Sequence, residues 1–544
     1  MISFCFQSCF IFALLFFFST LFLFAFFFKK PKNDLPPSPP SLPIIGYLHL
    51  ILAFFFGESF RQRIFNKEFY KNISLKDFLL LLSPMHTTFQ KISSMYGPFL
   101  SLRIVNFPIV IVSSASIIHE IFKAQDINVS YRGDIAIDEC IILGSFGVFR
   151  APHGDYWRFM KKLMVTNLLG TQALDRSRGV REFELERFYK NLLDMAKKKQ
   201  SVDIGEEALR LVTSTFGKMS VGSSFPKDNN DATKVSQLCV EFSALAHEFL
   251  FHKLLLQKLG ISLLKKNIMD VSHRFEELLE SIIVKYEEEK SEEHQGTECM
   301  DAFLAAYRGE NAEYKITRKN IKAFLAELFC GAGAFTASTT HWAMAEIINN
   351  PNILKRIREE IYSVVGKERL VQETDLPKLP YLQAVINETL RLHPVGPVLP
   401  REFQQDCTVG GFYIAKGTTL VINAYAVMRD PDYWEDPNKF KPERFLASSG
   451  SLQEEERREH AMKFLPFGGG RRRCPGSNVA SIIVGTAIGV MVQCFDWKIK
   501  SGNEVDMEEA PGLNFSLDLA HPLECIPLPR TLNPLATNMQ IMDL

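Results

Sequence analysis

Hydrophobic residues recur three and four positions apart, with charged residues between them, through long parts of this chain. The segments 180–196 and 271–289 show this pattern, which predicts amphipathic helices packed on a core. Helical patterning dominates residues 85–300 as a whole. Two short runs rich in branched and aromatic residues, 99–104 and 109–112, flank a brief turn and predict a β-hairpin.

A second strand-rich zone covers residues 407–421, where glycine-containing turns separate short apolar runs. A long apolar helix is predicted from 479 to 495. The sequence shows no internal repeat, and no segment after residue 46 has the composition of a domain linker. We therefore predict one large, mainly α domain with small β-sheets, an α+β fold, over residues 47–544.

The beginning of the chain has a different pattern. Residues 10–28 are almost wholly apolar, and a run of about 20 such residues is long enough to cross a bilayer as a helix. Lys29-Lys30-Pro31-Lys32 ends the run, and the positive-inside rule then places the following residues in the cytosol. This predicts a single-pass membrane anchor at residues 1–30. The basic, proline-rich residues 31–46 predict a stiff extended hinge.

The composition argues against several classes of function. Hydrophobic residues make up 47% and charged residues 23% of the 544 positions, enough for a sizeable core, and the formal net charge is +0. A nucleic-acid partner is not expected, because neutralising phosphates requires a surplus of Lys and Arg. The ten cysteines include no CxxC pair, which argues against a disulfide framework or a structural zinc site. Nine of them are interpreted as small hydrophobic residues in a reducing compartment.

Cys474 is the exception because of its surroundings. It lies in the run Phe467-Gly468-Gly469-Gly470-Arg471-Arg472-Arg473-Cys474-Pro475-Gly476, just before the predicted apolar helix. Thiolate is the form of cysteine that binds metals, and a following helix start favours an anion. Glycines let the backbone approach a flat cofactor, and Arg472 can pair with a carboxylate. A phosphate-cradling turn is the alternative, but the run lacks the Lys-Ser/Thr ending of a P-loop.

The run fits FxxGxRxCxG and resembles the cysteine loop of cytochromes P-450. The resemblance implies the cytochrome P-450 fold, preceded here by the transmembrane helix, and a haem b whose iron is bound by the Cys474 thiolate. Phe467 and Gly476 would belong to the loop that holds this cofactor. Two other classes of protein are alternatives: a haem-binding protein without oxygenase activity, and a membrane protein without haem.

Further motifs carry the same resemblance. Glu388-Thr389-Leu390-Arg391 resembles ExxR, whose two charged side chains share one helix face. Pro442-Glu443-Arg444-Phe445 resembles the PERF motif. The family pattern implies that Glu388, Arg391 and Arg444 form a buried, structural group of charges behind the cysteine loop.

The resemblance also implies contacts to the haem propionates. Trp157 and Lys161 stand where the family has WxxxR. Lys161 departs from this pattern, and its ammonium is a point charge, whereas the guanidinium of Arg can donate two parallel hydrogen bonds. Arg401, in Pro400-Arg401-Glu402, stands where a basic residue meets the other propionate. With Arg472, these are the expected cofactor-binding residues.

The distal motif of the family, (A/G)GxDT, is incomplete here. Its acid and alcohol supply protons during oxygen activation, and the matching stretch is Gly331-Ala332-Gly333-Ala334-Phe335-Thr336. With the register fixed on Trp342, Ala334 replaces the acid and Phe335 the alcohol. Thr336 could instead relay protons with water or a substrate hydroxyl. Two alternatives stay open: chemistry that needs less of this relay, or a haem-binding relative with impaired or no oxygenase activity.

Segments 364–385, 422–449 and 491–500 are similar to a crucifer group of plant microsomal P-450s that oxidise triterpenes. This implies a monooxygenase of the endoplasmic reticulum membrane, with a cytosolic catalytic domain, that inserts one atom of O2 into a lipophilic secondary metabolite such as a triterpene. Electrons would come from NADPH through a separate NADPH-cytochrome reductase, which Arg471 and Arg473 would help to dock unless they are merely solvated. Against this group, 53–82 looks like an insertion, either a retained non-coding segment or a membrane-contacting loop.

Overall fold

The structure is a computed structural model that describes residues 35–39, 84–104, 107–133, 147–225, 233–242, 245, 265–290, 299–309, 313–446, 461–500, 502, 504–511 and 516–530. The anchor predicted at 1–30, most of the hinge at 31–46 and the segment 53–82 lie outside the described residues. Within the described part, two helical stretches, Arg318–Asn349 and Ser477–Cys494, are long and apolar enough to span a membrane. Their most apolar windows are 61% and 72% buried inside the protein, as expected of core helices.

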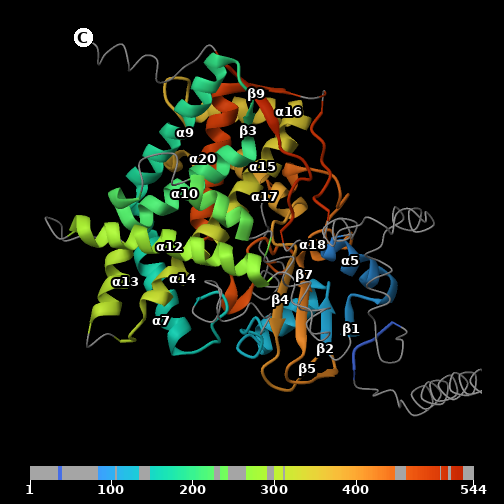
Figure 1. Ribbon diagram of the computed structural model, residues 1–544. Coiled ribbons are helices and arrows are strands. Elements are labelled where there is room, and N and C mark those ends of the chain that lie inside the picture. Colours follow the sequence, from blue (N-terminus) through green and yellow to red (C-terminus); the bar gives the residue numbers. More distant parts are fainter. Residues whose placement is uncertain are drawn as a thin grey trace, which may run out of the picture.

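Helices form the larger part of the molecule (Figure 1). In chain order they are α5 (Met85–Tyr96), α6 (Ala115–Ala124), α7 (Asp155–Met164), α8 (Thr171–Arg176), α9 (Arg178–Lys198), α10 (Ile204–Val221), α12 (Lys265–Lys290), α13 (Cys299–Arg308), α14 (Arg318–Leu328), α15 (Ala334–Asn349), α16 (Pro351–Val364), α17 (Pro380–Leu392), α18 (Ala424–Val427) and α20 (Ser477–Cys494). The helices predicted from 180–196, 271–289 and 479–495 correspond to α9, α12 and α20.

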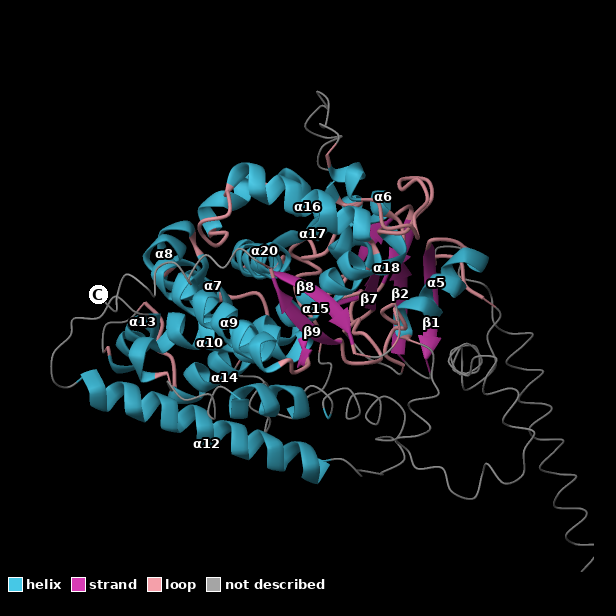
Figure 2. Ribbon diagram, turned by 90° about the horizontal axis from the view of Figure 1, so that it is seen from above, coloured by secondary structure: helices cyan, strands magenta, loops and turns pink. Residues whose placement is uncertain are grey.

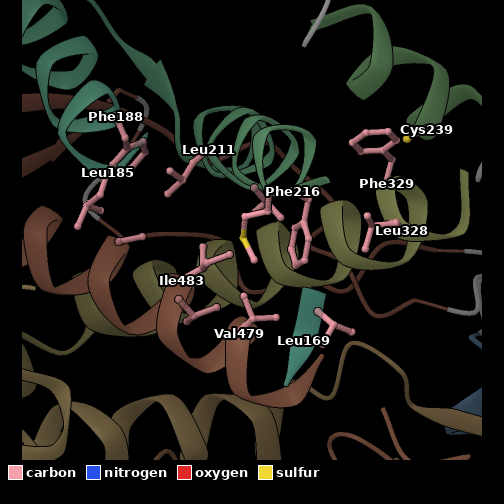
Figure 3. Close-up of a cluster of buried hydrophobic side chains, with 14 of the residues drawn as sticks. Leu169, Leu185, Phe188, Leu211, Phe216, Cys239, Leu328, Phe329, Val479 and Ile483 are labelled. Carbon is pink, nitrogen blue, oxygen red and sulfur yellow. The ribbon is translucent and has the colours of Figure 1, made fainter. Parts of the chain in front are cut away.

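The main core lies where α9, α10, α15 and α20 pack together. Figure 3 shows Leu211 and Phe216 of α10 facing Val479 and Ile483 of α20 across this core, and all four side chains are buried. From Ile483 to Cys494 α20 is buried on every side and mostly apolar, whereas its N-terminal part includes the exposed Asn478 and Ser481. Each such buried side chain contributes about 1.5–3 kcal/mol, so this contact fixes the helix that begins after the cysteine loop.

Small sheets complete the fold. The largest has the order β1-β2-β7-β4, in which β1 (Phe99–Ile104) and β2 (Phe107–Val112) are antiparallel, β2 and β7 (Thr419–Asn423) are parallel, and β4 (Val398–Glu402) is antiparallel to β7. A second sheet has the order β3-β9-β8, from β3 (Val202–Asp203), β9 (Glu524–Pro529) and β8 (Phe495–Ile499). β5 (Cys407–Val409) and β6 (Phe412–Ile414) form a hairpin. The predicted hairpin at 99–112 and the strand-rich zone at 407–421 are confirmed.

Figures 1 and 2 both place the larger sheet at one side of the molecule, beside α5 and α18, with α9, α10, α12 and α13 at the other side. α14 and α15 follow one another through the π-helix η5 (Phe329–Gly333), so that 318–349 is one long helix with a widened turn. Such widened turns are frequent at functional sites. This one ends at Gly333, directly before Ala334 and Phe335, the residues that depart from the distal motif.

Candidate haem site

The cysteine loop ends directly before α20. The backbone N–H of Cys474 donates to the Phe467 carbonyl at 2.9 Å, and the loop includes the short 3-10 helix η8 (Gly470–Arg472). Gly470 has a φ of +65°, and a Cβ there would lie 2.4 Å from Oδ1 of Asp126. Only glycine meets both conditions without strain, which explains why this part of the loop is glycine-rich.

The environment of Cys474 bears on its ability to bind a metal. Its side chain is accessible, although the surrounding protein still raises the pKa of its thiol above the usual value by burial. The amide of Gly476, Arg132 and Arg473 act in the opposite direction by favouring the thiolate. A cation bound at the sulfur would decide this balance in favour of the thiolate.

Trp157, Lys161 and Arg472 lie together beside this loop. The Arg472 guanidinium lies 4.6 Å from the centroid of the Trp157 ring, and Nζ of Lys161 lies 4.8 Å from it. Nζ of Lys161 also donates to the Arg471 carbonyl at 3.0 Å. Arg472 donates to the carbonyls of Ser130 (2.6 Å), Val148 (3.2 Å) and Ala151. The buried Trp157 ring is therefore a platform for two cations.

Two more guanidinium groups belong to the same region. Arg401, on β4, is 3% exposed, and burial together with Arg472 lowers its pKa to about 10. Burial, Arg401 and Arg472 likewise lower the pKa of the half-buried Arg132. No motif surrounds Arg132 in the sequence, so its position in the site could not be predicted from local patterns.

These basic groups fit a haem. Arg132, Arg401 and Arg472 share one region, and the carboxylates that partly compensate their charge are Glu327 and Asp126. Buried charge needs a counter-charge. Haem b carries paired propionates, which would supply anions there, while its iron would meet the accessible Cys474 thiol. The donor set and its charge are thus those that this cofactor requires.

The structure brings Glu388, Arg391 and Arg444 together. Arg391 donates from Nε and Nη2 to the two carboxylate oxygens of Glu388, at 2.7 and 2.9 Å, and both side chains are 0% exposed. Nε of Arg444 donates to Oε1 of Glu388 at 3.0 Å. Nη1 of Arg391 donates to the carbonyls of Met428 and Pro437, which fixes the segment that follows α18.

On the distal side, Ala334, Phe335 and Thr336 form the first turn of α15. The Phe335 side chain is 42% exposed, whereas Thr336 is 5% exposed. Trp342, used to fix the register, is fully buried, stacks on His393 at 3.9 Å and donates to the Leu517 carbonyl at 2.9 Å. Phe335 therefore occupies the open side of this turn, and the proton relay through Thr336 stays a prediction.

Comparison with known proteins decides the family. The cytochrome P450 family profile matches residues 73–519. The chain is a cytochrome P450. It is 55% identical to cytochrome P450 705A22 of Arabidopsis thaliana, over 97% of this chain and 98% of that protein, and 54% identical to cytochrome P450 705A1 of the same plant, over 98% of each. The predicted resemblance to the crucifer group is confirmed.

More distant relatives agree. The 3,9-dihydroxypterocarpan 6A-monooxygenase of Glycine max is 36% identical to this P450, over 94% of this chain and 96% of that enzyme. A zebrafish cytochrome P450 solved with abiraterone superposes with a TM-score of 0.69 at 23% identity, covering 82% of this chain and 99% of that one. That likeness shows the fold. As a cytochrome P450, the chain is a haem-thiolate monooxygenase whose cofactor is haem b bound through a cysteine thiolate.

Proposed function

We propose that this P450 uses O2 to insert one oxygen atom into a lipophilic plant secondary metabolite, such as a triterpene, with electrons from NADPH delivered by a separate reductase. The observation that carries the proposal is that the accessible Cys474 thiol and the buried cations Arg401 and Arg472 lie around the same residue, Arg132. The identity to plant P450s over nearly the full length supports the plant metabolite class.

When bound, haem b supplies the redox-active iron that activates dioxygen. Cys474 would bind this iron through its thiolate, and the Gly476 amide, which hydrogen-bonds the sulfur, would stabilise the negative charge of that thiolate. The residues that would hold the haem propionates are Trp157, Lys161, Arg401, Arg472 and Arg132. Phe467 closes the cysteine loop through its carbonyl.

The distal residues orient substrate and move protons. Phe335 presents an aromatic surface on the open side of α15, where it would pack on an apolar substrate. Thr336, with water or a substrate hydroxyl, relays protons in place of the missing acid. Glu388, Arg391 and Arg444 have a structural role, since their contacts fix segments on the proximal side of the fold.

The same proposal places the protein in the membrane of the endoplasmic reticulum. The apolar run 10–28, followed by lysines, would anchor it by a single pass with the catalytic domain in the cytosol. Arg471 and Arg473, both exposed beside the cysteine, offer positive charge to an acidic face of the reductase.

The test uses the full-length protein in microsomes together with an NADPH-cytochrome reductase and a panel of triterpenes and other lipophilic plant metabolites. NADPH-dependent products that gain one oxygen atom, labelled when 18O2 is supplied, are expected. A protein that binds haem normally but forms no product from any of these compounds, while a related P450 in the same preparation does, would instead be a haem-binding relative without oxygenase activity. Comparing metabolites of plants with the gene silenced would then identify the substrate.

A further inference from the structure

Glu327 is a carboxylate that the proposed chemistry leaves without a role. It lies near the end of α14, directly before the π-helix of the distal helix. The backbone N–H of Val148 donates to its Oε2 and that of Phe149 to its Oε1, both at 2.8 Å. One carboxylate thus holds two successive peptides of a loop that is 178 positions away in the chain.

The carbonyls of the same two residues accept hydrogen bonds from cations of the haem site. The Val148 carbonyl accepts from Nη1 of Arg472 at 3.2 Å, and the Phe149 carbonyl accepts from Nη1 of Arg132 at 3.2 Å. The Arg132 guanidinium also lies 3.6 Å from the centroid of the Phe149 ring, which is 55% exposed. Segment 148–149 therefore connects the distal helix to Arg472 of the cysteine loop and to Arg132.

The local sequence is adapted to this contact. A Cβ at Gly147 would lie 2.0 Å from Oε1 of Glu327, so only glycine lets the carboxylate reach both amides. Burial raises the pKa of the Glu327 carboxyl to about 7, although the amides of Phe149 and Val148 and the charges of Arg132 and Arg472 oppose this. The group is therefore mainly a carboxylate only above a pH of about 7.

We propose that Glu327 is a positioning residue that fixes Val148 and Phe149, and through them the Arg132 guanidinium and the Phe149 ring, at the edge of the haem site. Both oxygens must accept hydrogen bonds for this to work. A carboxylate can do so, whereas an amide or a protonated acid offers one donor in place of one acceptor. The inference requires haem binding, which family membership establishes, and is independent of the substrate.

The test compares full-length holoenzymes carrying Glu327 or Glu327→Gln. Hydrogen exchange of the 147–151 segment should become at least about tenfold faster in the variant, because a charge-assisted hydrogen bond is lost. Rebinding of carbon monoxide after flash photolysis should change from one phase to several, because Phe149 and Arg132 then occupy more than one position. The matched control is Glu313→Gln, an exposed carboxylate paired with Lys162, which should alter neither measurement.

A pH profile separates positioning from a merely structural contribution. As the pH falls from 8 to 6, protonation of Glu327 should make wild-type rebinding approach that of Glu327→Gln, whose own profile stays flat. The other charged or titratable groups facing Glu327 are Arg132, Arg472, Tyr156 and Cys330. The arginines stay charged in this range, and the raised pKa values of Tyr156 and Cys330 keep both neutral.

Gly147→Ala and Glu327→Asp are second variants in case Glu327→Gln does not fold, since each keeps the charge but prevents the carboxylate from reaching both amides. Both should reproduce the faster exchange and the multiphasic rebinding. Unchanged exchange in a folded variant would overturn the proposal. Faster exchange with unchanged rebinding at every pH would overturn it as well, because the contact would then be structural only.

Discussion

Glu388 and Arg391 form two hydrogen bonds, at 2.7 and 2.9 Å, in a place where neither side chain is accessible to solvent. Because they are three residues apart on α17, the helix itself brings them face to face. Arg444 then reaches the same carboxylate from the PERF segment, η7 (Pro442–Phe445), at 3.0 Å. α17 is thereby connected to a segment more than 50 residues further along the chain.

Replacing Glu388 by Gln should destabilise the protein strongly. The variant leaves Arg391 buried without a counter-charge, and breaking a buried pair in this way costs about 3–5 kcal/mol. Urea denaturation of the holoenzyme, followed by the thiolate-haem absorption band, measures the loss. Glu359→Gln, which removes a 65% exposed carboxylate paired with Lys355, is the control and should unfold like wild type. Equal midpoints for the two variants would contradict the structural role.

Replacing Trp157 by Leu should weaken haem retention. The ring supports the Arg472 and Lys161 cations, and such contacts contribute about 0.5–2 kcal/mol each. Transfer of haem to apomyoglobin should therefore be several-fold faster, and Trp157→Phe should be intermediate because it keeps a smaller aromatic face. Trp497→Leu, in the β8 strand, serves as the control. If Trp157→Leu and Trp497→Leu release haem at the same rate, the platform has no role in holding the cofactor.

Removing the Arg401 cation should also accelerate haem loss. Arg401 is buried with Arg472 as a like-charged neighbour and Asp126 compensates only part of its charge, so a bound anion would stabilise it. We expect Arg401→Leu to release haem at least about tenfold faster, as the loss of a charge-assisted hydrogen bond predicts. Arg103→Leu, at an exposed position of β1, provides the comparison. If Arg401→Leu released haem at the wild-type rate, the propionates would have to bind elsewhere.

Ala334 and Phe335, which replace the acid and the alcohol of the family pattern, should limit the fraction of NADPH that yields oxygenated product. Introducing Ala334→Asp and Phe335→Thr together restores the acid and alcohol of the family pattern in the first turn of α15. The fraction of NADPH converted to oxygenated product should then rise, with less hydrogen peroxide released, because proton delivery is completed. Stoichiometry of NADPH, peroxide and product measures this. A wild-type enzyme that already couples fully would show that the missing pair does not limit proton delivery.

Local patterns predicted much of this molecule. The hairpin at 99–112, the helix α20 and the cysteine loop each depend on neighbouring residues, so their periodicity and glycines indicate them directly. Arg132 and Glu327 could not be found in this way. Their significance comes from contacts with segments far along the chain, such as the bonds between Glu327 and the Val148 and Phe149 amides, and no local spacing encodes such contacts.

The first turn of α15 also could not be fully predicted from local patterns. The sequence indicates that this turn lacks the carboxylate, but it does not indicate which of Phe335 and Thr336 faces open space. Packing of the buried Trp342 against His393 fixes the rotation of α15, and this rotation leaves Phe335 exposed and Thr336 buried. Which side of a helix is open depends on what surrounds it, and that is decided by the tertiary fold.

The central claim is that Cys474 is the thiolate ligand of the haem iron, and the absorption spectrum of the reduced, carbon monoxide-bound protein tests it most directly. Wild-type protein should show the long-wavelength Soret band that thiolate ligation produces, and Cys474→Ser should lose it. Replacing another cysteine, for example Cys525→Ser, should leave the band in place. A wild-type spectrum without this band, or a Cys474→Ser variant that keeps it, would contradict the account.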